Sequence, residues 1–193
     1  MLENLKKYSI ILGSKSPRRQ ELLTGIISDF KIQLKEIDES FSQNLKKQEI
    51  PVYLSQQKAK VFETELKSTN KLVITCDTIV WINNHVLNKP GDKNEAVKML
   101  EELSGNMHEV FTGVTLSSSK KTVSFYESTK VHFKKLSAEE IHFYIDQFKP
   151  YDKAGSYGVQ EWMGYVGMCR IEGCFFNVMG LPLSKLYTEL EKF

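Results

Sequence analysis

Apolar and polar residues follow two repeating patterns along this chain, and together they divide it into short strands and amphipathic helices. The predicted strands are segments in which apolar and β-branched residues run together or alternate with polar ones: residues 8–12, 30–37, 72–82, 85–87, 110–116 and 122–133. The predicted helices are segments in which apolar residues recur every three or four positions: residues 17–26, 51–66, 93–103, 138–148 and 182–193. Because strands and helices mix along the chain, the pattern predicts the α/β class.

Capping residues mark the starts of several predicted helices. Ser16 followed by Pro17 suits the first helix, since the missing N–H of a proline loses nothing at the first helical position. Asp92 is expected to cap a later helix, and Ser137 with Glu140 forms a capping box for another. A strand, a loop and a helix therefore follow one another at the start of the sequence.

Length and composition describe an ordinary globular protein. The 193 residues lie in the usual one-domain range, and 41% of them are hydrophobic while 26% are charged. We therefore expect a single domain over residues 1–193, a length that is also compatible with two lobes. The net charge of only +2 excludes a field strong enough for general nucleic-acid binding.

Cysteine usage and the lack of long apolar stretches favour a cytoplasmic protein without a membrane partner. Cys76, Cys169 and Cys174 are odd in number and form no C-x-x-C pair, so neither a disulfide framework nor a cysteine zinc site is indicated. The apolar run near the start is too short for a signal-peptide core, and no run approaches membrane-spanning length. Four histidines without metal-site spacing are interpreted as structural or surface residues: His85, His108, His132 and His142.

The loop after the first predicted strand has the residues of an anion-binding site. Backbone N–H groups at the start of the next helix favour a negative ligand, and Arg18 and Arg19 add guanidinium groups that match phosphate oxygens. The spacings of a Walker loop and of a dinucleotide-binding fingerprint are both missing. The segment predicts phosphate binding, and an ordinary capped helix with two solvated arginines is the alternative.

Asp77 interrupts an otherwise apolar strand and is the best candidate for a general base. A carboxylate buried in such a strand is unfavourable unless it is paired, so Asp77 needs a partner, a metal or a functional reason. A satisfied structural carboxylate at a strand bend beside Thr78 is the alternative.

An acidic cluster follows the alternating segment at residues 30–37. Glu36, Asp38 and Glu39 could supply hard oxygen ligands to Mg²⁺, which needs only one or two protein carboxylates. Most acidic runs at strand ends are simply solvated, and that alternative stays open.

Two lysines are candidates for holding phosphate. Lys89 precedes Pro90, which disfavours helical geometry at the residue before it and so keeps the lysine in an extended loop. Lys58 lies near the apolar face of its predicted helix, where its stem could equally cover the core while its ammonium stays in water.

A glycine-containing loop at residues 152–160 has the features of base recognition. Its small residues let the backbone approach a ligand, Tyr157 could stack on a base, and Gln160 offers an amide edge. A surface Ω-loop after a helix stopped by Pro150 is the alternative.

Taken together, several motifs resemble the Maf family of nucleotide pyrophosphatases, and the match runs almost end to end. They are SKSPRRQELL at residues 14–23, CDTIV at 76–80, NKP at 88–90, LSG at 103–105, KAGSYGVQ at 153–160 and VMGLPL at 178–183. The resemblance implies an α/β fold related to the inosine triphosphatases, with an elongated mixed sheet flanked by helices and two lobes with a nucleotide cleft. It also implies hydrolysis of nucleoside triphosphates between the α and β phosphates, a divalent cation (Mg²⁺ or Mn²⁺) and a homodimer.

The chain resembles the branch of the family that favours dTTP and UTP. By that resemblance Asp77 is the proton acceptor, and Arg18, Thr78 and Gln160 occupy the positions that set pyrimidine specificity. The remaining residues expected to bind the triphosphate or the metal are Ser14, Ser16, Arg19, Lys58 and Lys89 for the substrate and Glu39 for the metal.

Two departures from the family pattern are visible. Gly13 stands where alanine is usual, and Gln57 stands before Lys58 where a glutamate is common. Because a neutral amide does not replace a charged metal ligand on equal terms, Gln57 puts metal affinity in doubt more than reaction type. A non-catalytic nucleotide-binding regulator of septum formation or cell division, and a house-cleaning enzyme for modified nucleotides, are the alternative functions.

Overall fold

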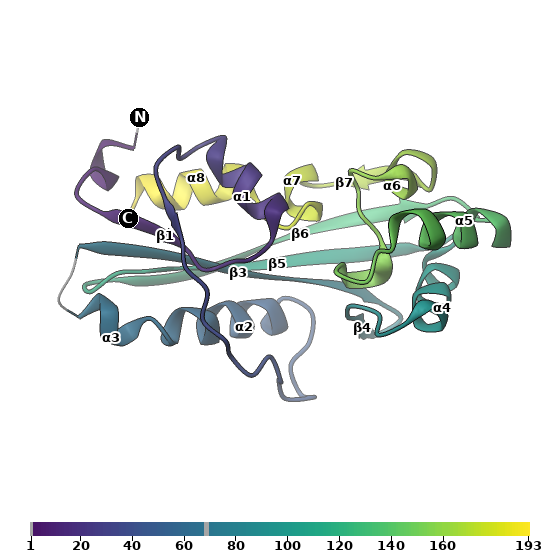
Figure 1. Ribbon diagram of the computed structural model, residues 1–193, viewed down its shortest axis with the longest axis horizontal. Helices are drawn as coiled ribbons and strands as arrows, with labels where there is room; N and C mark the ends of the chain where they lie inside the picture. The colour runs from purple at the N-terminus through teal and green to yellow at the C-terminus, as the bar shows by residue number, and fades with distance from the viewer. Residues whose placement is uncertain (1, 68–69) are drawn as a thin grey trace. The chain divides into compact units, whose positions relative to one another are not determined.

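The computed structural model describes residues 2–67 and 70–193, and within them a mixed sheet of seven strands is flanked by helices (Figure 1). The strands are β1 Ser9–Leu12, β2 Lys31–Ile32, β3 Lys71–Ile82, β4 His85–Leu87, β5 Met107–Ser117, β6 Thr122–Phe133 and β7 Met168–Glu172. The α-helices are α1 Pro17–Thr24, α2 Glu49–Lys60, α3 Glu63–Leu66, α4 Lys93–Leu103, α5 Ala138–Phe148, α6 Trp162–Val166, α7 Phe175–Val178 and α8 Leu183–Glu191. Two short 3₁₀ helices are η1 Glu3–Leu5 and η2 Ala154–Ser156. The α/β class is confirmed.

The strands lie in the order β2-β1-β3-β5-β6-β7, and β4 pairs with β3 beside this path. The chain divides into two compact units. Unit 1 contains the chain up to Asp77 together with Thr112–Glu127 and Gly180–Phe193, and unit 2 contains Thr78–Phe111 and Ser128–Met179. The long strands β3, β5 and β6 each contribute residues to both units.

Unit 1 is built around parallel strand pairs. Strand β1 pairs in parallel with β2 and β3, with Ile11 opposite Lys31 on one side and opposite Val73 on the other. Helices α1 and α8 lie on one face of these strands, and α2 and α3 lie on the other (Figure 1). Ile11 and Val73 pack with Phe62 and Leu66, so the strands and the α3 region share a core.

Unit 2 has its own hydrophobic core, in which the unit 2 parts of β3, β5 and β6 pack with helices α4 and α5. Both helices begin as predicted, since the Asp92 side chain accepts from the Glu95 N–H and Ser137 with Glu140 forms a capping box. The buried residues of this core include members of the glycine-containing loop and of α6: Val80, Leu100, Val131, Phe133, Ile141, Tyr144, Ile145, Tyr157 and Met163.

Several predictions of element bounds were wrong: the strand predicted at 110–116 is β5, Met107–Ser117, and α6 and α7 had no predicted counterpart. Two further differences have clear physical reasons. The strand predicted at 30–37 is only Lys31–Ile32, because β1 ends at Leu12 and no other strand among the described residues pairs with the chain beyond Gln33. The helix predicted at 51–66 is two helices, α2 and α3. It begins at Glu49, so that Pro51 lies in the first turn, where its missing N–H is tolerated.

The turn predicted at Asn83 and Asn84 is confirmed. Asn83 and Asn84 have φ of 47° and 63°, the left-handed geometry of a tight hairpin between β3 and β4. Among the described helices there is none whose length and apolar character would let it cross a membrane.

Candidate active site

Arg19 ties the loop after β1 to two other segments of unit 1. Its Nε donates to the Gly180 carbonyl at 2.9 Å, and its Nη1 donates to the Cys76 carbonyl at 3.1 Å and to Ser14 Oγ at 3.5 Å. Ser14 is only 5% exposed. The guanidinium therefore fixes the loop beside the residue that precedes Asp77.

The start of α1 matches the prediction in position and differs in one contact. Ser16 is the N-cap, with extended φ of −68°, and Pro17 follows in the first turn. The Ser16 hydroxyl makes no capping hydrogen bond, whereas its backbone N–H donates to Ser14 Oγ at 3.3 Å. The N–H groups of the first helical turn still face the loop, where they can bind an anion beside the partly exposed Arg18.

Lys58 brings two predicted carboxylates together. Its Nζ lies 2.6 Å from Asp77 Oδ1 and 2.8 Å from Glu39 Oε1. The side chains of Lys58 and Asp77 are largely buried, while that of Glu39 is 55% exposed. Asp77 is therefore a paired carboxylate in a strand, and the structure joins three sequence-predicted site residues through one ammonium.

The ammonium of Lys58 is charged in this arrangement. Burial lowers the pKa of Lys58, but the charge and hydrogen bond of Asp77 and the hydrogen bond of Glu39 outweigh it, so that the pKa lies above its ordinary value. The site therefore holds a permanent positive charge next to Asp77, with Arg19 near enough to repel it.

Close packing of α2 against the sheet holds Lys58 in place. A Cβ added to Gly113 of β5 would lie 2.3 Å from the Pro51 carbonyl carbon, so only glycine lets the helix backbone come this near. Ser55 Oγ shares a hydrogen bond with Thr115 Oγ1 at 2.8 Å, and Thr75 Oγ1 donates to the Ser55 carbonyl at 2.7 Å. These buried contacts bind the helix to β3 and β5.

The donor chemistry at this site fits a divalent cation held mainly by its substrate. Glu39 and Asp77 are hard oxygen donors that converge on one point, since both contact Lys58 Nζ. In the described residues there is no group of three or more His, Cys, Asp or Glu side chains that could hold a metal ion. Mg²⁺ commonly uses one or two carboxylates together with water and phosphate oxygens, so the small number of carboxylates here is compatible with such a cation.

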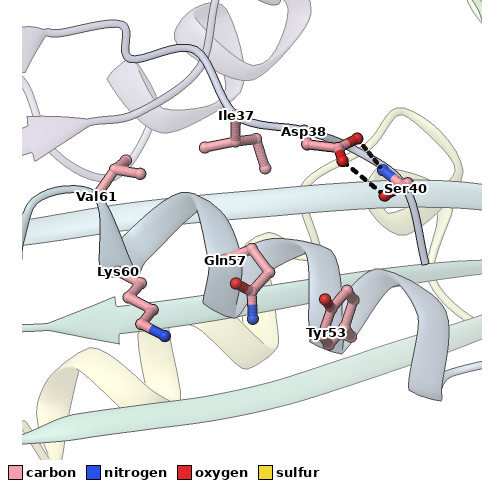
Figure 2. A pocket seen from close by; sticks show the side chains of 7 residues that line it. All are labelled: Ile37, Asp38, Ser40, Tyr53, Gln57, Lys60 and Val61. Atoms are coloured by element: carbon pink, nitrogen blue, oxygen red, sulfur yellow. Dashed lines mark hydrogen bonds between the residues drawn. The ribbon is translucent and has the colours of Figure 1, made fainter. Parts of the chain in front are cut away.

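Gln57, the residue before Lys58, lines a hollow beside α2. Figure 2 shows this hollow, of about 410 Å³, between α2 and the segment that contains Ile37 and Asp38. Asp38 accepts hydrogen bonds from the Ser40 backbone N–H at 2.9 Å and hydroxyl at 2.8 Å, and so closes its own turn. Within the acidic cluster, Glu39 contacts Lys58, whereas Asp38 lines this hollow.

Gly13, the other departure from the family pattern, has a local reason. A Cβ at this position would lie 2.9 Å from the methyl group of Thr75 and 3.4 Å from the Phe62 ring. The absence of a side chain at Gly13 thus accommodates Thr75, which is itself part of the contact between β3 and α2.

The remaining predicted site residues belong to unit 2. Thr78 follows Asp77 directly along β3, and Lys89 is an exposed residue after β4. The Gly155 N–H donates to the Asn88 carbonyl at 3.1 Å, which places the Lys89 segment beside the loop that leads to Gln160. The structure therefore assembles two groups of site residues, one in each unit.

Tyr157 has a different role from the one expected. Its side chain is 6% exposed, and its ring packs edge-on against those of His108 and Phe133, with centroids 5.4 and 5.0 Å away. The prediction that Tyr157 stacks on a base was wrong, because the ring is part of the unit 2 core. Gln160, three residues later, is partly exposed and stays a candidate.

Polar residues to which no sequence motif had assigned a role support this loop. Tyr144 and Glu161 are hydrogen-bonded to each other, and Lys153 Nζ lies 2.9 Å from Glu161 Oε1. His108 could have been found, because the alternation of β5 places it on the same strand face as the buried Val110. Its contact with Tyr157 spans 49 positions and has no local signal.

Comparisons with known proteins identify the family and the fold of this chain. The family model described as Maf-like protein matches residues 9–193. A dTTP/UTP pyrophosphatase of Parabacteroides distasonis is 48% identical over 194 residues, and one of Bacteroides thetaiotaomicron is 49% identical over 193 residues; both alignments cover 100% of each chain. The solved structure of the Staphylococcus aureus Ham1 protein matches with a TM-score of 0.53 at 14% identity, covering 94% of this chain and 99% of that one, which shows a shared fold.

Proposed function

This chain belongs to the Maf family, and from that premise we propose that it hydrolyses dTTP and UTP to the nucleoside monophosphate and pyrophosphate. The observation that carries the proposal is the Asp77 carboxylate, held at 2.6 Å by Lys58 beside the Arg19 loop. A base that accepts a proton from water, together with two cations and a helix N-terminus that offset negative charge on the phosphates, would favour attack of water on a phosphoanhydride.

The proposed chemical step uses one water molecule. Lys58 holds Oδ1 of Asp77, so Oδ2 is the oxygen that takes a proton from the water. The water oxygen forms a bond to the α-phosphorus, and the bond from that phosphorus to the α,β-bridging oxygen breaks. The bridging oxygen leaves with the β and γ phosphates as pyrophosphate.

The cations of unit 1 hold the triphosphate during this step. Arg19 is preorganised by the carbonyls of Cys76 and Gly180, so little entropy is lost when it binds a phosphate oxygen. Lys58 already lies at the base, and its charge stabilises the negative charge that develops on the phosphates. Ser14, Ser16 and Lys89 are proposed as further triphosphate ligands.

Glu39 is the residue proposed to hold a divalent cation, with phosphate oxygens completing the coordination. When bound, such a cation supplies charge neutralisation at the phosphates. Lys58 contacts Glu39 in this structure, so a cation held by Glu39 would share the carboxylate with the ammonium.

Base selection is proposed to lie with Arg18, Thr78 and Gln160. Gln160 offers both a donor and an acceptor for the edge of a pyrimidine, and its backbone carbonyl accepts from the Tyr165 hydroxyl at 2.5 Å. We also propose that both units act as one domain and that the protein forms a homodimer. We expect it to work in the cytoplasm, where its three free cysteines stay reduced.

A panel of canonical and modified triphosphates with Mg²⁺ and with Mn²⁺ tests the proposal. Pyrophosphate as first product, with dTTP and UTP preferred, is the expected result. Orthophosphate as first product would refute the reaction type, and a modified pyrimidine used far better than dTTP would favour the house-cleaning alternative. No product from any nucleotide that binds would favour a non-catalytic regulator.

A further inference from the structure

His108 and Tyr157 share a hydrogen bond of 2.7 Å between Nε2 and the phenol oxygen, inside the core of unit 2. His108 is 1% exposed and its ring also packs edge-on against Phe133, with centroids 5.2 Å apart. This is a polar pair between β5 and the loop that leads to Gln160, in an otherwise apolar cluster.

The pair adds little to stability. His108 Nδ1 is buried and has no hydrogen-bond partner in the described chain, so the imidazole is only half satisfied. Burial lowers the pKa of His108 to about 3, which keeps the ring neutral at physiological pH. A buried polar group with an unmet donor or acceptor costs free energy that an apolar ring of similar shape would not.

The loop needs such a contact because its own backbone is unusual. Gly155 and Ser156 both have left-handed backbone, with φ of 68° and 60°, and a Cβ at Gly155 would lie 3.0 Å from Val80. Tyr157 is the next residue, so its side chain anchors the chain where it leaves this turn. The Gly158 N–H then donates to the Tyr144 hydroxyl at 3.0 Å.

We propose that His108 is a positioning residue for base selection, acting through its hydrogen bond to Tyr157 to hold Gln160 in place. The inference rests on the proposed function, since it assigns Gln160 to the pyrimidine edge. Two residues, Gly158 and Val159, separate Tyr157 from Gln160, and both are buried, so a shift of the phenol moves the amide. The residues of unit 1 that are proposed to bind the triphosphate take no part in the contact between His108 and Tyr157.

Two single variants and their combination separate positioning from packing. His108→Phe leaves the Tyr157 hydroxyl without its partner, and Tyr157→Phe leaves the imidazole without its partner. The double variant removes both polar groups, so its stability should return toward the wild type. The hydrogen bond between residues 108 and 157 is absent from all three variants. His108→Gln is the conservative variant, because its amide can form a hydrogen bond with the phenol and should restore base preference.

The readouts are kinetic and structural. We expect the kcat/KM ratio of dTTP to dCTP to fall about fivefold in the double variant, the size of one hydrogen bond, through KM for dTTP rather than kcat. Hydrogen exchange of the amides at 155–160 should rise in parallel. Asn177→Ala is the matched control, because that buried side chain donates to the Val110 carbonyl and Thr129 Oγ1 and lies outside the loop.

The results distinguish a failure of the positioning role of His108 from a failure of the proposed function. A double variant with wild-type base ratio and wild-type loop exchange overturns the positioning role, and so does an equal loss in the Asn177→Ala control. A wild-type protein that leaves dTTP intact refutes the proposed function alone, since the hydrogen-exchange comparison still tests whether the pair holds the loop.

Discussion

Lys58 and Asp77 are 19 positions apart in the sequence, and the lysine donates a 2.6 Å hydrogen bond to the carboxylate. One residue comes from the last turn of α2 and the other from the middle of β3. Through this pair the Asp77 carboxylate, which lies in an apolar strand, has a charged partner, and the same ammonium also contacts Glu39.

Asp77→Asn should abolish most turnover and keep the fold. The amide has nearly the same shape but cannot accept the proton from water, and a positioned base contributes about 10²- to 10⁴-fold in rate. Pyrophosphate release from dTTP measures the loss, and circular dichroism with thermal unfolding measures the fold. Turnover near that of the wild type would remove Asp77 from its proposed role.

Lys58→Met should reduce kcat/KM strongly, because Asp77 and Glu39 would then face each other without the ammonium between them. Lys60→Met is a matched control from the same helix turn, since Lys60 lines the hollow of Figure 2 instead. Steady-state kinetics on dTTP compare the two. Equal effects of both changes would show that general charge, and not this ion pair, matters.

Gly113→Ala should damage both stability and activity. Its new methyl group would overlap the backbone of Pro51, and overpacking of this kind costs about 1–3 kcal/mol or more. Helix α2 must shift to relieve the overlap, and Lys58 shifts with it.

Gly25→Ala is the control for that change, because Gly25 has an ordinary helical φ of −65° at the end of α1. Urea unfolding and dTTP kinetics should show only small effects for this variant. An unchanged free energy of unfolding in Gly113→Ala would contradict the close packing of α2 on β5.

Gln160→Ala and Arg18→Ala should change base preference more than they change stability. Loss of a hydrogen bond to the base weakens discrimination by about two- to tenfold, while the triphosphate contacts in unit 1 persist. The measurement is kcat/KM for dTTP, UTP, dCTP and dGTP with each variant. A uniform loss across all four nucleotides would argue for phosphate binding instead.

Acid should destabilise the protein partly through His108. Its folded pKa of about 3, lowered by burial and then by the charge of His132, is below the ordinary value of 6.5. Between those two pKa values the imidazole is protonated in the unfolded chain and neutral in the folded chain. The free energy of unfolding is therefore unaffected by this group above pH 6.5 and decreases as the pH falls toward 3.

The size of that effect is about 1.4 kcal/mol per pH unit within the window. Urea unfolding at pH 7, 6 and 5 should therefore show a steeper loss of stability for the wild type than for His108→Gln. Parallel curves for the two proteins would mean that His108 is protonated as easily in the folded state as in the unfolded one.

Local patterns in the sequence predicted the elements whose causes are themselves local. The capping box at Ser137, the asparagine turn at Asn83 and the long apolar strand that contains Asp77 all follow from side chains within a few positions of each other. The strand expected at 30–37 failed because a strand needs a partner, and β1 ends before it could supply one.

The sequence by itself determined the α/β class and the starts of α1, α4 and α5, and it supplied the candidates for phosphate binding and proton transfer, because residue type and spacing carry that information. Only the tertiary structure decided which of them meet. Lys58 joins Asp77 and Glu39 because Gly113 lets α2 approach β5, and Tyr157 joins the core because His108 lies on the inner face of β5. Contacts between distant segments depend on how the strands and helices pack, and no local pattern in the chain records that packing.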